Sequence, residues 1–363
     1  MEVFLVVTHG RGSIDLYSIR LAQHLKIPKL HTDVYQRISA LFGKSLADPS
    51  LVKGIELLLS FSKKLNEIPG IPHFPNHHLG RFAYFLNKPF IVTVHDIMRY
   101  LDILWNGTLI SKPSSQDKLW LTMDFKAIKK AAKVIVPSNH TKKDLVKYLK
   151  VPEEKIEVIP HGVDDFKPRL GRRPCKEPYI LYVGTEHPRK NLKTAFKAFK
   201  LLKEESPRFK DLKFVKVGRA GGKERCFREE TLRIINSLGI AKDVIFISWV
   251  SKEELESYYT QAELFIFPSI YEGFGWPPLE AMQCNCPVIA SNTTSIPEVL
   301  GDATILLSPL NVKAWKDAME EVLTDESLRK ELVEKGASHA KKFSWKKAAE
   351  RTLKVYQEIL ESS

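Results

Sequence analysis

The sequence predicts an α/β protein made of two domains, each built around a doubly wound parallel sheet. Short β-branched runs recur along the chain without polar alternation, as expected for strands that are buried on both faces. Helical patterns lie between these runs, which fits repeated βαβ units. The length of 363 residues also suits two domains, at about 100–200 residues each.

The predicted strands fall into two groups, separated by a charged stretch rich in proline and glycine at residues 164–178. Such a composition is typical of a linker. We therefore expect an N-terminal domain over 1–168, a C-terminal domain over 169–343 and a final helix over 344–363. The ten predicted strands are 3–7, 90–94, 133–136, 156–159, 179–183, 212–217, 244–247, 264–267, 288–290 and 303–307.

Helix boundaries are clearest in the second half. Ser251 and Glu254 form a capping box, which predicts a helix that ends near Gln261. Asn285 is expected to adopt the left-handed conformation that ends a helix before a strand. Residues 344–360 predict an amphipathic helix that packs on its own domain or reaches back to the first. Its apolar face is expected to contain Trp345, Ala348, Ala349, Leu353, Tyr356, Ile359 and Leu360.

The chain is basic, with 56 Lys and Arg against 43 Asp and Glu and a net charge of +13. The excess is +8 in residues 1–168 and +5 in the remainder, so no tail concentrates it. Such a charge favours an anionic partner, namely nucleic acid, a lipid headgroup or a phosphorylated small molecule, with a solvated surface as the alternative.

The cysteines and the apolar runs indicate the cellular compartment in which the protein is expected. Cys175, Cys226, Cys284 and Cys286 do not indicate a disulfide framework or a zinc motif, so we expect buried, reduced thiols. The start of the chain is typical of a first strand rather than a signal peptide, and no run of about 18 apolar residues occurs. Together these features predict a cytoplasmic protein.

The most informative segment is 268–282, PSIYEGFGWPPLEAM. It predicts a strand end, a loop with glycines and a helix that begins at two prolines. The backbone N–H groups of residues 274–276 would then point at a ligand. Glu272 and Glu280 could hold hydroxyl groups at two separated points of that ligand. The alternative is an ordinary helix start with a solvated Glu280.

A second segment places two cations after a predicted strand. Gly184 follows the strand, and Arg189, Lys190 and Asn191 stand where a helix begins. Two cations beside a helix N-terminus form an anion site that suits a diphosphate. Its place at the carboxyl end of a parallel strand supports this interpretation over a pair of surface cations.

In the first half, two short motifs follow predicted strands. Gly10 and Gly12 resemble a turn that contacts phosphate, although the third glycine of a dinucleotide fingerprint and a Walker lysine are missing. His95 and Asp96 follow the strand at 90–94, where a functional histidine or a buried structural one would both fit.

Three further histidines, His73, His77 and His78, are expected to form a polar loop that lines an acceptor site. A metal site at these residues has no apparent fourth ligand. No Asp-x-Asp metal motif occurs in a matching place elsewhere in the chain. The sequence therefore predicts no metal site.

Taken together and in this order, the segments resemble the retaining glycosyltransferases of family 4. The most specific element is the E-x7-E pattern that Glu272 and Glu280 match. Supporting matches lie at 158–164, 184–191, 297–299 and 343–345, and the resemblance is strongest from 158 to 301. It implies the GT-B architecture, in which two Rossmann-like domains face each other across a cleft and a C-terminal helix crosses back to the first domain.

The resemblance also implies roles for individual residues. Arg189 and Lys190 would stabilise the departing diphosphate, Glu272 would hold the donor sugar near its reacting carbon, and His95 would lie near the transferred sugar. Glu280 would bind the ribose hydroxyls, and backbone near Val250 would meet the base. The implied donor-binding residues are Gly10, Gly12, Gly184, Arg189, Lys190, Val250, Gly273, Phe274, Gly275 and Glu280.

The implied activity is retaining transfer of a hexose from a nucleotide-diphosphate sugar to a saccharide, lipid-linked or polyol acceptor. No cofactor is expected besides this donor substrate. The likeness of residues 183–191 to mannosyltransferases favours GDP-mannose, with UDP-glucose or a similar donor as the alternative. Many relatives place an arginine where Thr185 stands, so Arg189 and Lys190 would carry the positive charge without it.

Two other functions are considered. Another GT-B enzyme, such as a sugar-nucleotide epimerase or a phosphorylase, would share the fold, although no lysine motif for pyridoxal phosphate supports a phosphorylase. A basic protein that binds a membrane or nucleic acid without catalysis would explain the charge. No helix-turn-helix, RNP-type aromatic motif or zinc finger supports nucleic acid as a partner.

Two sets of lysines in the first half predict peripheral contact with the inner face of an anionic membrane, where a lipid-linked acceptor would lie. This expectation requires each set to occupy one helix face, and a solvated surface is the alternative. The lysines are Lys126, Lys129, Lys130, Lys133, Lys142, Lys143, Lys147 and Lys150.

Overall fold

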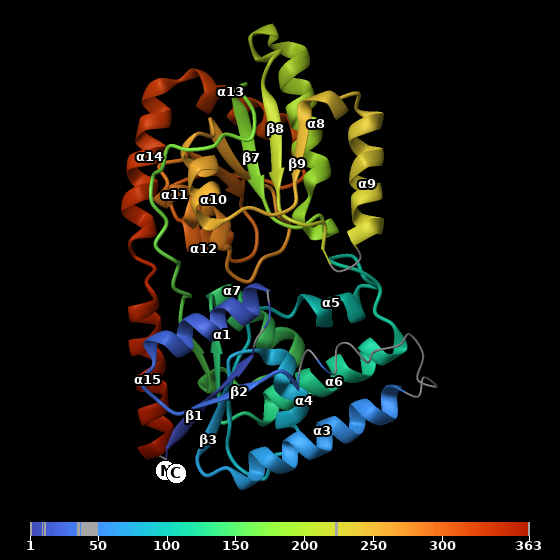
Figure 1. Ribbon diagram of the computed structural model, residues 1–363, viewed down its shortest axis with the longest axis vertical. Helices are drawn as coiled ribbons and strands as arrows, with labels where there is room; N and C mark the ends of the chain where they lie inside the picture. The colour runs from blue at the N-terminus through green and yellow to red at the C-terminus, as the bar shows by residue number, and fades with distance from the viewer. Residues whose placement is uncertain are drawn as a thin grey trace. The chain divides into compact units, whose positions relative to one another are not determined.

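The computed structural model describes residues 2–8, 10, 12–34, 37, 50–221 and 224–361. The chain forms two compact units, each with a six-stranded parallel sheet (Figure 1). Unit 1 comprises Met1–Gly162 and Phe343–Ser363, and unit 2 comprises Val163–Lys342. The prediction of two doubly wound α/β domains with a long C-terminal helix is confirmed.

The sheet of unit 1 has the strand order β2-β1-β3-β4-β5-β6. Because β2 and β3 lie on opposite sides of β1, the winding direction changes at β1, where open parallel sheets place ligand sites. The strands are β1 (Val3–Thr8), β2 (Lys29–Thr32), β3 (Ile71–Phe74), β4 (Ile91–Thr93), β5 (Lys133–Val136) and β6 (Ile156–Val158). The helices are α1 (Ser13–His24), α3 (Ser50–Glu67), α4 (Gly80–Ala83), α5 (Met98–Leu104), α6 (Ser115–Lys130), α7 (Asn139–Asp144) and α15 (Trp345–Glu361).

The sheet of unit 2 has the order β12-β11-β10-β7-β8-β9, so its winding changes between β7 and β10. On one face, α8 packs on α13 over a core that includes Phe196, Phe214 and Trp315. The strands are β7 (Tyr179–Val183), β8 (Lys213–Val217), β9 (Val244–Ile247), β10 (Leu264–Phe267), β11 (Val288–Ser291) and β12 (Ile305–Leu307). The helices are α8 (Leu192–Glu205), α9 (Glu224–Ser237), α10 (Lys252–Thr260), α11 (Trp276–Gln283), α12 (Ile296–Leu300), α13 (Val312–Thr324) and α14 (Glu326–Ala340).

All ten predicted strands are present, and two further strands, β2 and β3, were not predicted. The side chains of β2 are exposed or only partly buried, so its sequence lacks an apolar run. In β3, Pro72 and His73 interrupt the apolar pattern, yet all four residues are buried. The expectation of a polar loop is therefore wrong for His73, which lies inside the sheet, and for His77, which is 2% exposed.

The predicted helix boundaries are confirmed in unit 2. Ser251 Oγ accepts a hydrogen bond from the Glu254 N–H at 3.2 Å, the Glu254 carboxylate accepts one from the Ser251 N–H at 3.0 Å, and α10 is capped at Gln261. Asn285 has a φ of 58°, in the left-handed region. The cysteine prediction holds for Cys284 and Cys286, which are buried, but is wrong for Cys226, which is exposed.

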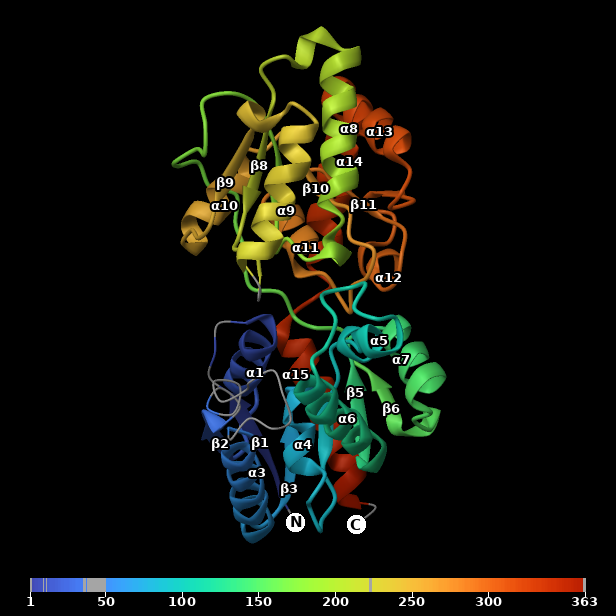
Figure 2. The ribbon, with the colours of Figure 1, turned by 90° about the vertical axis from the view of Figure 1, so that its right-hand side faces the viewer.

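Helix α15 belongs to unit 1 and lies beside α1 (Figure 2). Most of its predicted apolar face is buried, but Leu353 is 37% exposed and Leu360 is only partly buried. Thr352 and Val355 lie on the buried face between Ala349 and Tyr356, so the true stripe runs one position away from Leu353.

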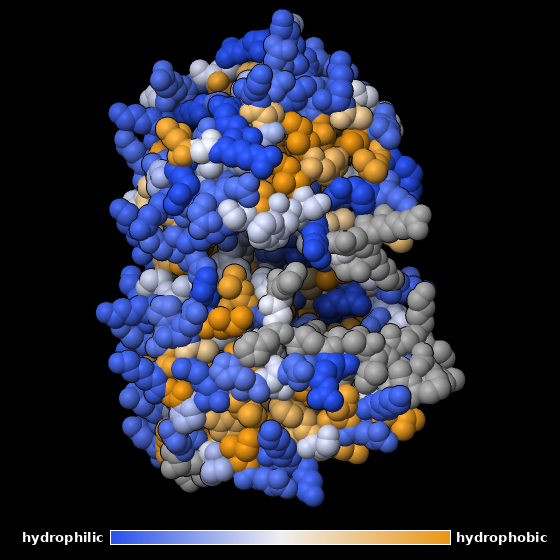
Figure 3. All heavy atoms as spheres, in the orientation of Figure 1, coloured by the Kyte–Doolittle hydropathy of each residue, from blue (hydrophilic) through white to orange (hydrophobic). Residues whose placement is uncertain are grey.

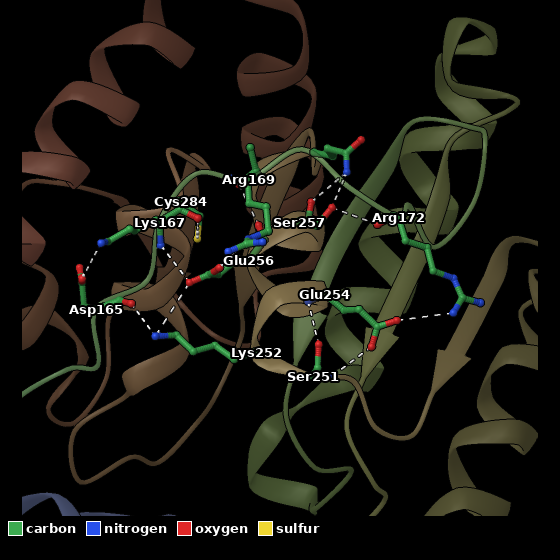
Figure 4. Close-up of polar contacts among 12 residues, drawn as sticks. Asp165, Lys167, Arg169, Arg172, Ser251, Lys252, Glu254, Glu256, Ser257 and Cys284 are labelled. Atoms are coloured by element: carbon green, nitrogen blue, oxygen red, sulfur yellow. Dashed lines mark hydrogen bonds and ion pairs between the residues drawn. The ribbon is translucent and has the colours of Figure 1, made fainter.

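The segment that the sequence predicts as a linker is bound along much of its length to α10 of unit 2 (Figure 4). The Glu256 carboxylate accepts hydrogen bonds from Arg169 Nε at 3.0 Å and from the Lys167 N–H at 3.3 Å. Ser257 Oγ donates to the Arg172 carbonyl at 3.0 Å. Hydrogen bonds made by residues 167–172 therefore anchor this segment to unit 2.

Hydrophilic side chains cover most of the face shown in Figure 3, in keeping with the charge of the chain. In the part of the chain that the structure describes, no helix is both long and apolar enough to cross a membrane. Lys133 is the first residue of β5 and not part of α6, so the first set of predicted lysines does not share one helix face.

Candidate active site

The loop after β7 brings two cations to the carboxyl edge of the unit 2 sheet. Pro188–Lys190 form a single 3-10 turn, and Asn191, with a φ of 53°, joins that turn to α8. The Asn191 side-chain amide donates to the carbonyls of Pro268 at 3.1 Å and Pro309 at 2.6 Å. These bonds tie the loop to the neighbouring loop after β10.

The loop after β10 is fixed from both sides. The Ile270 N–H donates to the Arg189 carbonyl at 2.7 Å, and the Glu272 N–H donates to Thr294 Oγ1 at 3.1 Å. Gly275 ends the loop with a φ of 107°, a conformation that side chains other than glycine rarely adopt, and α11 begins at the next residue. The switch point between β7 and β10 therefore has a rigid lining.

Arg189, Lys190 and Glu272 form an ion cluster at this point. Glu272 Oε1 lies 2.8 Å from Arg189 Nη1 and 2.6 Å from Lys190 Nζ, and the three side chains are only 9–12% exposed. Although burial opposes it, the charges of Arg189 and Lys190 lower the pKa of Glu272 to about 2. The cluster carries two positive charges and one negative charge, so its excess favours an anionic ligand.

Glu280, the second glutamate of the E-x7-E pattern, lies in α11. Its Oε2 accepts a hydrogen bond from Tyr259 Oη of α10 at 2.9 Å. Burial raises the pKa of Glu280 to about 7, while the bond from Tyr259 opposes that rise. The two glutamates of the E-x7-E pattern therefore differ in charge state near neutral pH: Glu272 is ionised and Glu280 is close to its midpoint.

The remaining predicted residues of unit 2 lie on the loops at the carboxyl edge. Gly184 directly follows β7, and its N–H donates to the Val217 carbonyl at 2.9 Å. Gly273 and Phe274 belong to the loop between Glu272 and α11, and Phe274 is 6% exposed. Val250 directly precedes the N-cap of α10.

A network that the sequence analysis missed supports the loop after β7. Glu186 and Lys216 have side chains with 0% exposure and form an ion pair at 2.8 Å, and Arg228 adds a second cation to Glu186 at 2.6 Å. Although burial opposes it, the bonds from Arg228 and Lys216 lower the pKa of Glu186. A lysine between two valines of a buried strand is the signal that could have revealed it.

In unit 1, His95 follows β4 and is 7% exposed. Its Nε2 lies 2.8 Å from the Pro75 carbonyl, and its Nδ1 lies 3.2 Å from Nε2 of His161. Because the carbonyl only accepts, His95 Nε2 carries the proton and Nδ1 accepts from His161. Burial lowers the pKa of His95 to about 4, so its ring is neutral at pH 7.

Gly10 and Gly12 stand before α1, and both lie close to the carboxylate of Asp15. Gly12 is the N-cap residue, and its N–H donates to Asp15 Oδ2 at 3.4 Å. A Cβ on Gly10 would lie 2.1 Å from the same oxygen. Asp15 also accepts from Thr8 Oγ1 at 2.8 Å, so it holds the end of β1 and the start of α1 together.

Comparison with known proteins agrees with this geometry. Two doubly wound units define the GT-B class, and solved structures of that kind superpose on nearly the whole chain. Sucrose-phosphate synthase from Thermosynechococcus elongatus matches with a TM-score of 0.75 and 21% identity, over 99% of each chain. Anabaena HepE in complex with UDP and glucose matches with a TM-score of 0.75 and 16% identity, over 98% of this chain and 99% of that one. These likenesses confirm the GT-B fold.

Two family descriptions match overlapping stretches of the sequence: Glycosyltransferase Family 4 over residues 68–167 and Glycosyl transferases group 1 over residues 164–339. Together the two matches span residues 68–339, so the chain belongs to the family 4 glycosyltransferases that its E-x7-E pattern resembles.

Among the curated relatives, O-antigen chain mannosyltransferase B of Escherichia coli is 31% identical over 62% of this chain and 60% of its own length. Serotype-specific mannosyltransferase WbdA of Escherichia coli is 28% identical over 64% of this chain and 30% of its own length. The chain therefore spans less than two thirds of these relatives.

Proposed function

We propose that this protein transfers a hexose, with retention, from a nucleoside-diphosphate sugar to a saccharide, lipid-linked or polyol acceptor. The ion cluster of Arg189, Lys190 and Glu272 at the switch point of unit 2 is the observation that carries this proposal. GDP-mannose is the favoured donor, because relatives such as O-antigen chain mannosyltransferase B are named for that sugar. UDP-glucose is the second candidate, because Anabaena HepE is described in complex with UDP and glucose.

The two cations serve the leaving group in this proposal. As the bond between the sugar C1 and the phosphate oxygen breaks, negative charge develops on the terminal phosphate. Arg189 and Lys190 are already held in place, so they stabilise this charge without the cost of reorganising solvent. No step of the proposal requires a metal ion.

Glu272 is assigned to the donor sugar, together with the backbone of Gly273, Phe274 and Gly275. Its low pKa keeps it ionised, which suits a carboxylate that accepts hydrogen bonds from sugar hydroxyls. Transfer would occur on the face of the sugar from which the phosphate leaves: the acceptor oxygen bonds to C1, and its proton passes to the departing phosphate oxygen. This route needs no nucleophilic carboxylate and gives retention.

The other predicted residues keep the roles that the resemblance implies. We assign Glu280 to the ribose hydroxyls and the backbone at Val250 to the base. Gly184, in the loop after β7, is assigned to donor binding. In unit 1, Gly10 and Gly12 are assigned to contact with phosphate. The neutral ring and backbone of His95 are assigned to the transferred sugar.

A panel of donors tests the proposal. GDP-mannose, UDP-glucose, UDP-N-acetylglucosamine and ADP-glucose are added to the protein, and the unfolding temperature is recorded for each, because a ligand of the native state raises it. We expect GDP-mannose to give the largest rise, and GDP to be released from it in the presence and absence of EDTA. If no donor releases its nucleoside diphosphate, with or without saccharide acceptors, the proposal is wrong.

The membrane hypothesis has its own test. Exposed lysines of unit 1, including Lys126, Lys129, Lys143 and Lys147, support a peripheral contact with an anionic surface. We expect the protein to sediment with vesicles that contain phosphatidylglycerol and not with neutral vesicles. Equal recovery in both supernatants would leave these lysines as a solvated surface.

A further inference from the structure

Tyr259 of α10 is a buried hydroxyl aimed at the carboxylate of Glu280. The tyrosine is 0% exposed, and its Oη lies 2.9 Å from Glu280 Oε2. Its ring is held edge-on by Phe265, at 5.5 Å between ring centroids, and by Phe166, at 6.1 Å. Packing therefore fixes the direction of the hydroxyl independently of Glu280.

The hydroxyl can act only as a donor toward this carboxylate. Burial, reinforced by the charge of Glu280, raises the pKa of Tyr259 well above its usual value, so the phenol stays protonated. Tyr259 is the only hydrogen-bond partner of the Glu280 carboxylate among the residues that the structure describes. Oε1 of the same carboxylate thus remains available to a ligand.

We propose that Tyr259 is a positioning residue for nucleotide binding: its hydroxyl holds Oε2 of Glu280 and so presents Oε1, as part of an ionised carboxylate, to the hydroxyls of the donor. The inference rests on the proposed function, in which Glu280 binds the ribose. It adds a residue from a different helix, 21 positions earlier in the chain, to that site.

The charges around Glu280 make this contribution measurable. Burial raises the pKa of Glu280 to about 7, the bond from Tyr259 lowers it, the charge of Asp164 raises it and that of Lys252 lowers it. Loss of the Tyr259 hydroxyl should therefore raise the pKa of Glu280 above 7. At neutral pH more of the carboxyl would then be protonated and unable to accept two hydroxyl donors.

The experiment compares Tyr259→Phe with the wild type by calorimetric titration with GDP and, in parallel, with UDP from pH 6 to pH 9. Tyr258→Phe is the matched control, since Tyr258 is the neighbouring residue of α10 and its backbone carbonyl, not its side chain, accepts from Tyr179 Oη at 2.8 Å. Each comparison is made at one pH, so ionisation of the nucleotide cancels.

We expect Tyr259→Phe to weaken nucleotide binding about fivefold at pH 7, because a rise of about one unit in the pKa of Glu280 would lower its ionised fraction from about one half to about one tenth. At pH 9 the loss should be less than about twofold. Tyr258→Phe should match the wild type throughout. In a Glu280→Gln background, Tyr259→Phe should have no further effect, because the hydroxyl acts through the carboxylate.

Two results would overturn the inference alone: wild-type affinity of Tyr259→Phe at every pH, or a loss of affinity that is the same from pH 6 to pH 9 and so reflects packing only. If the wild type binds neither GDP nor UDP, the proposed function fails, and this inference fails with it.

Discussion

Lys190 Nζ and Glu272 Oε1 lie 2.6 Å apart, with each side chain only 9% exposed, and they come from loops 82 positions apart in the chain. Each side chain would be costly to bury alone, because an unpaired charge in a poorly hydrated site loses its solvation. The pair is therefore a structural element of the candidate site as well as part of its proposed chemistry.

Removal of the lysine tests its proposed part in catalysis. Lys190→Ala should lower kcat by about 100-fold, the scale expected when one preorganised stabiliser of a developing charge is lost. Glu272 keeps Arg189 as its partner in this variant, so we expect the fold to survive. The measurement is single-turnover release of nucleoside diphosphate at saturating donor.

The control for this experiment is Lys193→Ala, which removes an exposed lysine from the first turn of α8. It changes the net charge by the same amount and should leave kcat unchanged. Near-normal turnover of Lys190→Ala would contradict the diphosphate assignment.

The same ion cluster predicts a dependence of stability on acid. The folded-state pKa of Glu272 is lowered from 4.5 to about 2, so its stabilisation is complete above about pH 4.5 and is lost as the pH falls toward 2. The full contribution is about 3 kcal/mol, from 1.36 kcal/mol per unit of pKa. This loss should appear between pH 5 and pH 3 when the urea unfolding of unit 2 is monitored by hydrogen exchange of peptides from β7 and β10.

Glu272→Gln provides the comparison, because its side chain does not titrate in this range. It should be less stable than the wild type at pH 7, with the difference narrowing as the pH falls. Parallel curves for the two proteins between pH 5 and pH 3 would mean that Glu272 is not the group responsible.

The buried histidines of unit 1 predict a second loss of stability in acid, at a higher pH than the loss that Glu272 causes in unit 2. Burial lowers the pKa of His95 to about 4 and that of His73 to about 3, and also lowers those of His77 and His161. A lowered folded-state pKa gives stability that is complete above about pH 6.5 and declines as the pH falls below it.

At pH 5.5 the lowered pKa values of His73 and His95 should each reduce the free energy of unfolding of unit 1 by about 1 kcal/mol. Hydrogen exchange, corrected for the intrinsic effect of pH, should show peptides from β3 and β4 losing protection between pH 7 and pH 5.5. Peptides from β7 and β10 in unit 2 should keep theirs over the same range. Equal loss in both units would contradict this prediction.

The two glycines before α1 offer a matched pair of substitutions. A Cβ on Gly10 would lie 2.1 Å from Asp15 Oδ2 and 2.6 Å from its Cγ, whereas a Cβ on Gly12 would lie 3.5 Å from Oδ2. Gly10→Ala should therefore displace Asp15 and cost about 2 kcal/mol, a typical effect of a steric conflict. Gly12→Ala should cost less than about 1 kcal/mol, since only a cap residue changes. Thermal unfolding of the two variants measures the difference.

Local signals in the sequence were sufficient for much of this fold. The strands with continuous apolar runs, such as Val3–Thr8 and Leu264–Phe267, are buried on both faces and needed no knowledge of their neighbours. Likewise, the capping box at Ser251 and the left-handed Asn285 depend on the residues next to them. β3 escaped prediction because His73 is accommodated by distant partners, Tyr356 and Thr93.

For the candidate site, the residue types were predictable but their pairing was not. The spacing of Glu272 and Glu280 gave no sign that one would bind two cations and the other a tyrosine. Those partners come from loops and helices that only the folded chain brings together. The different charge states of the two glutamates follow from these long-range contacts and not from the E-x7-E pattern itself.

The membership of α15 in unit 1 has a consequence for shortened forms of the protein. Tyr356 Oη lies 2.6 Å from His73 Nδ1 inside the first sheet, and a Cβ on Gly162 would lie 2.3 Å from the Trp345 backbone nitrogen. A nonsense mutation just before Trp345 would thus spare every residue of the second sheet and still empty part of the first core. Such a mutation would lie near the 3′ end of the coding sequence, yet it would destabilise unit 1, most of which is synthesised first.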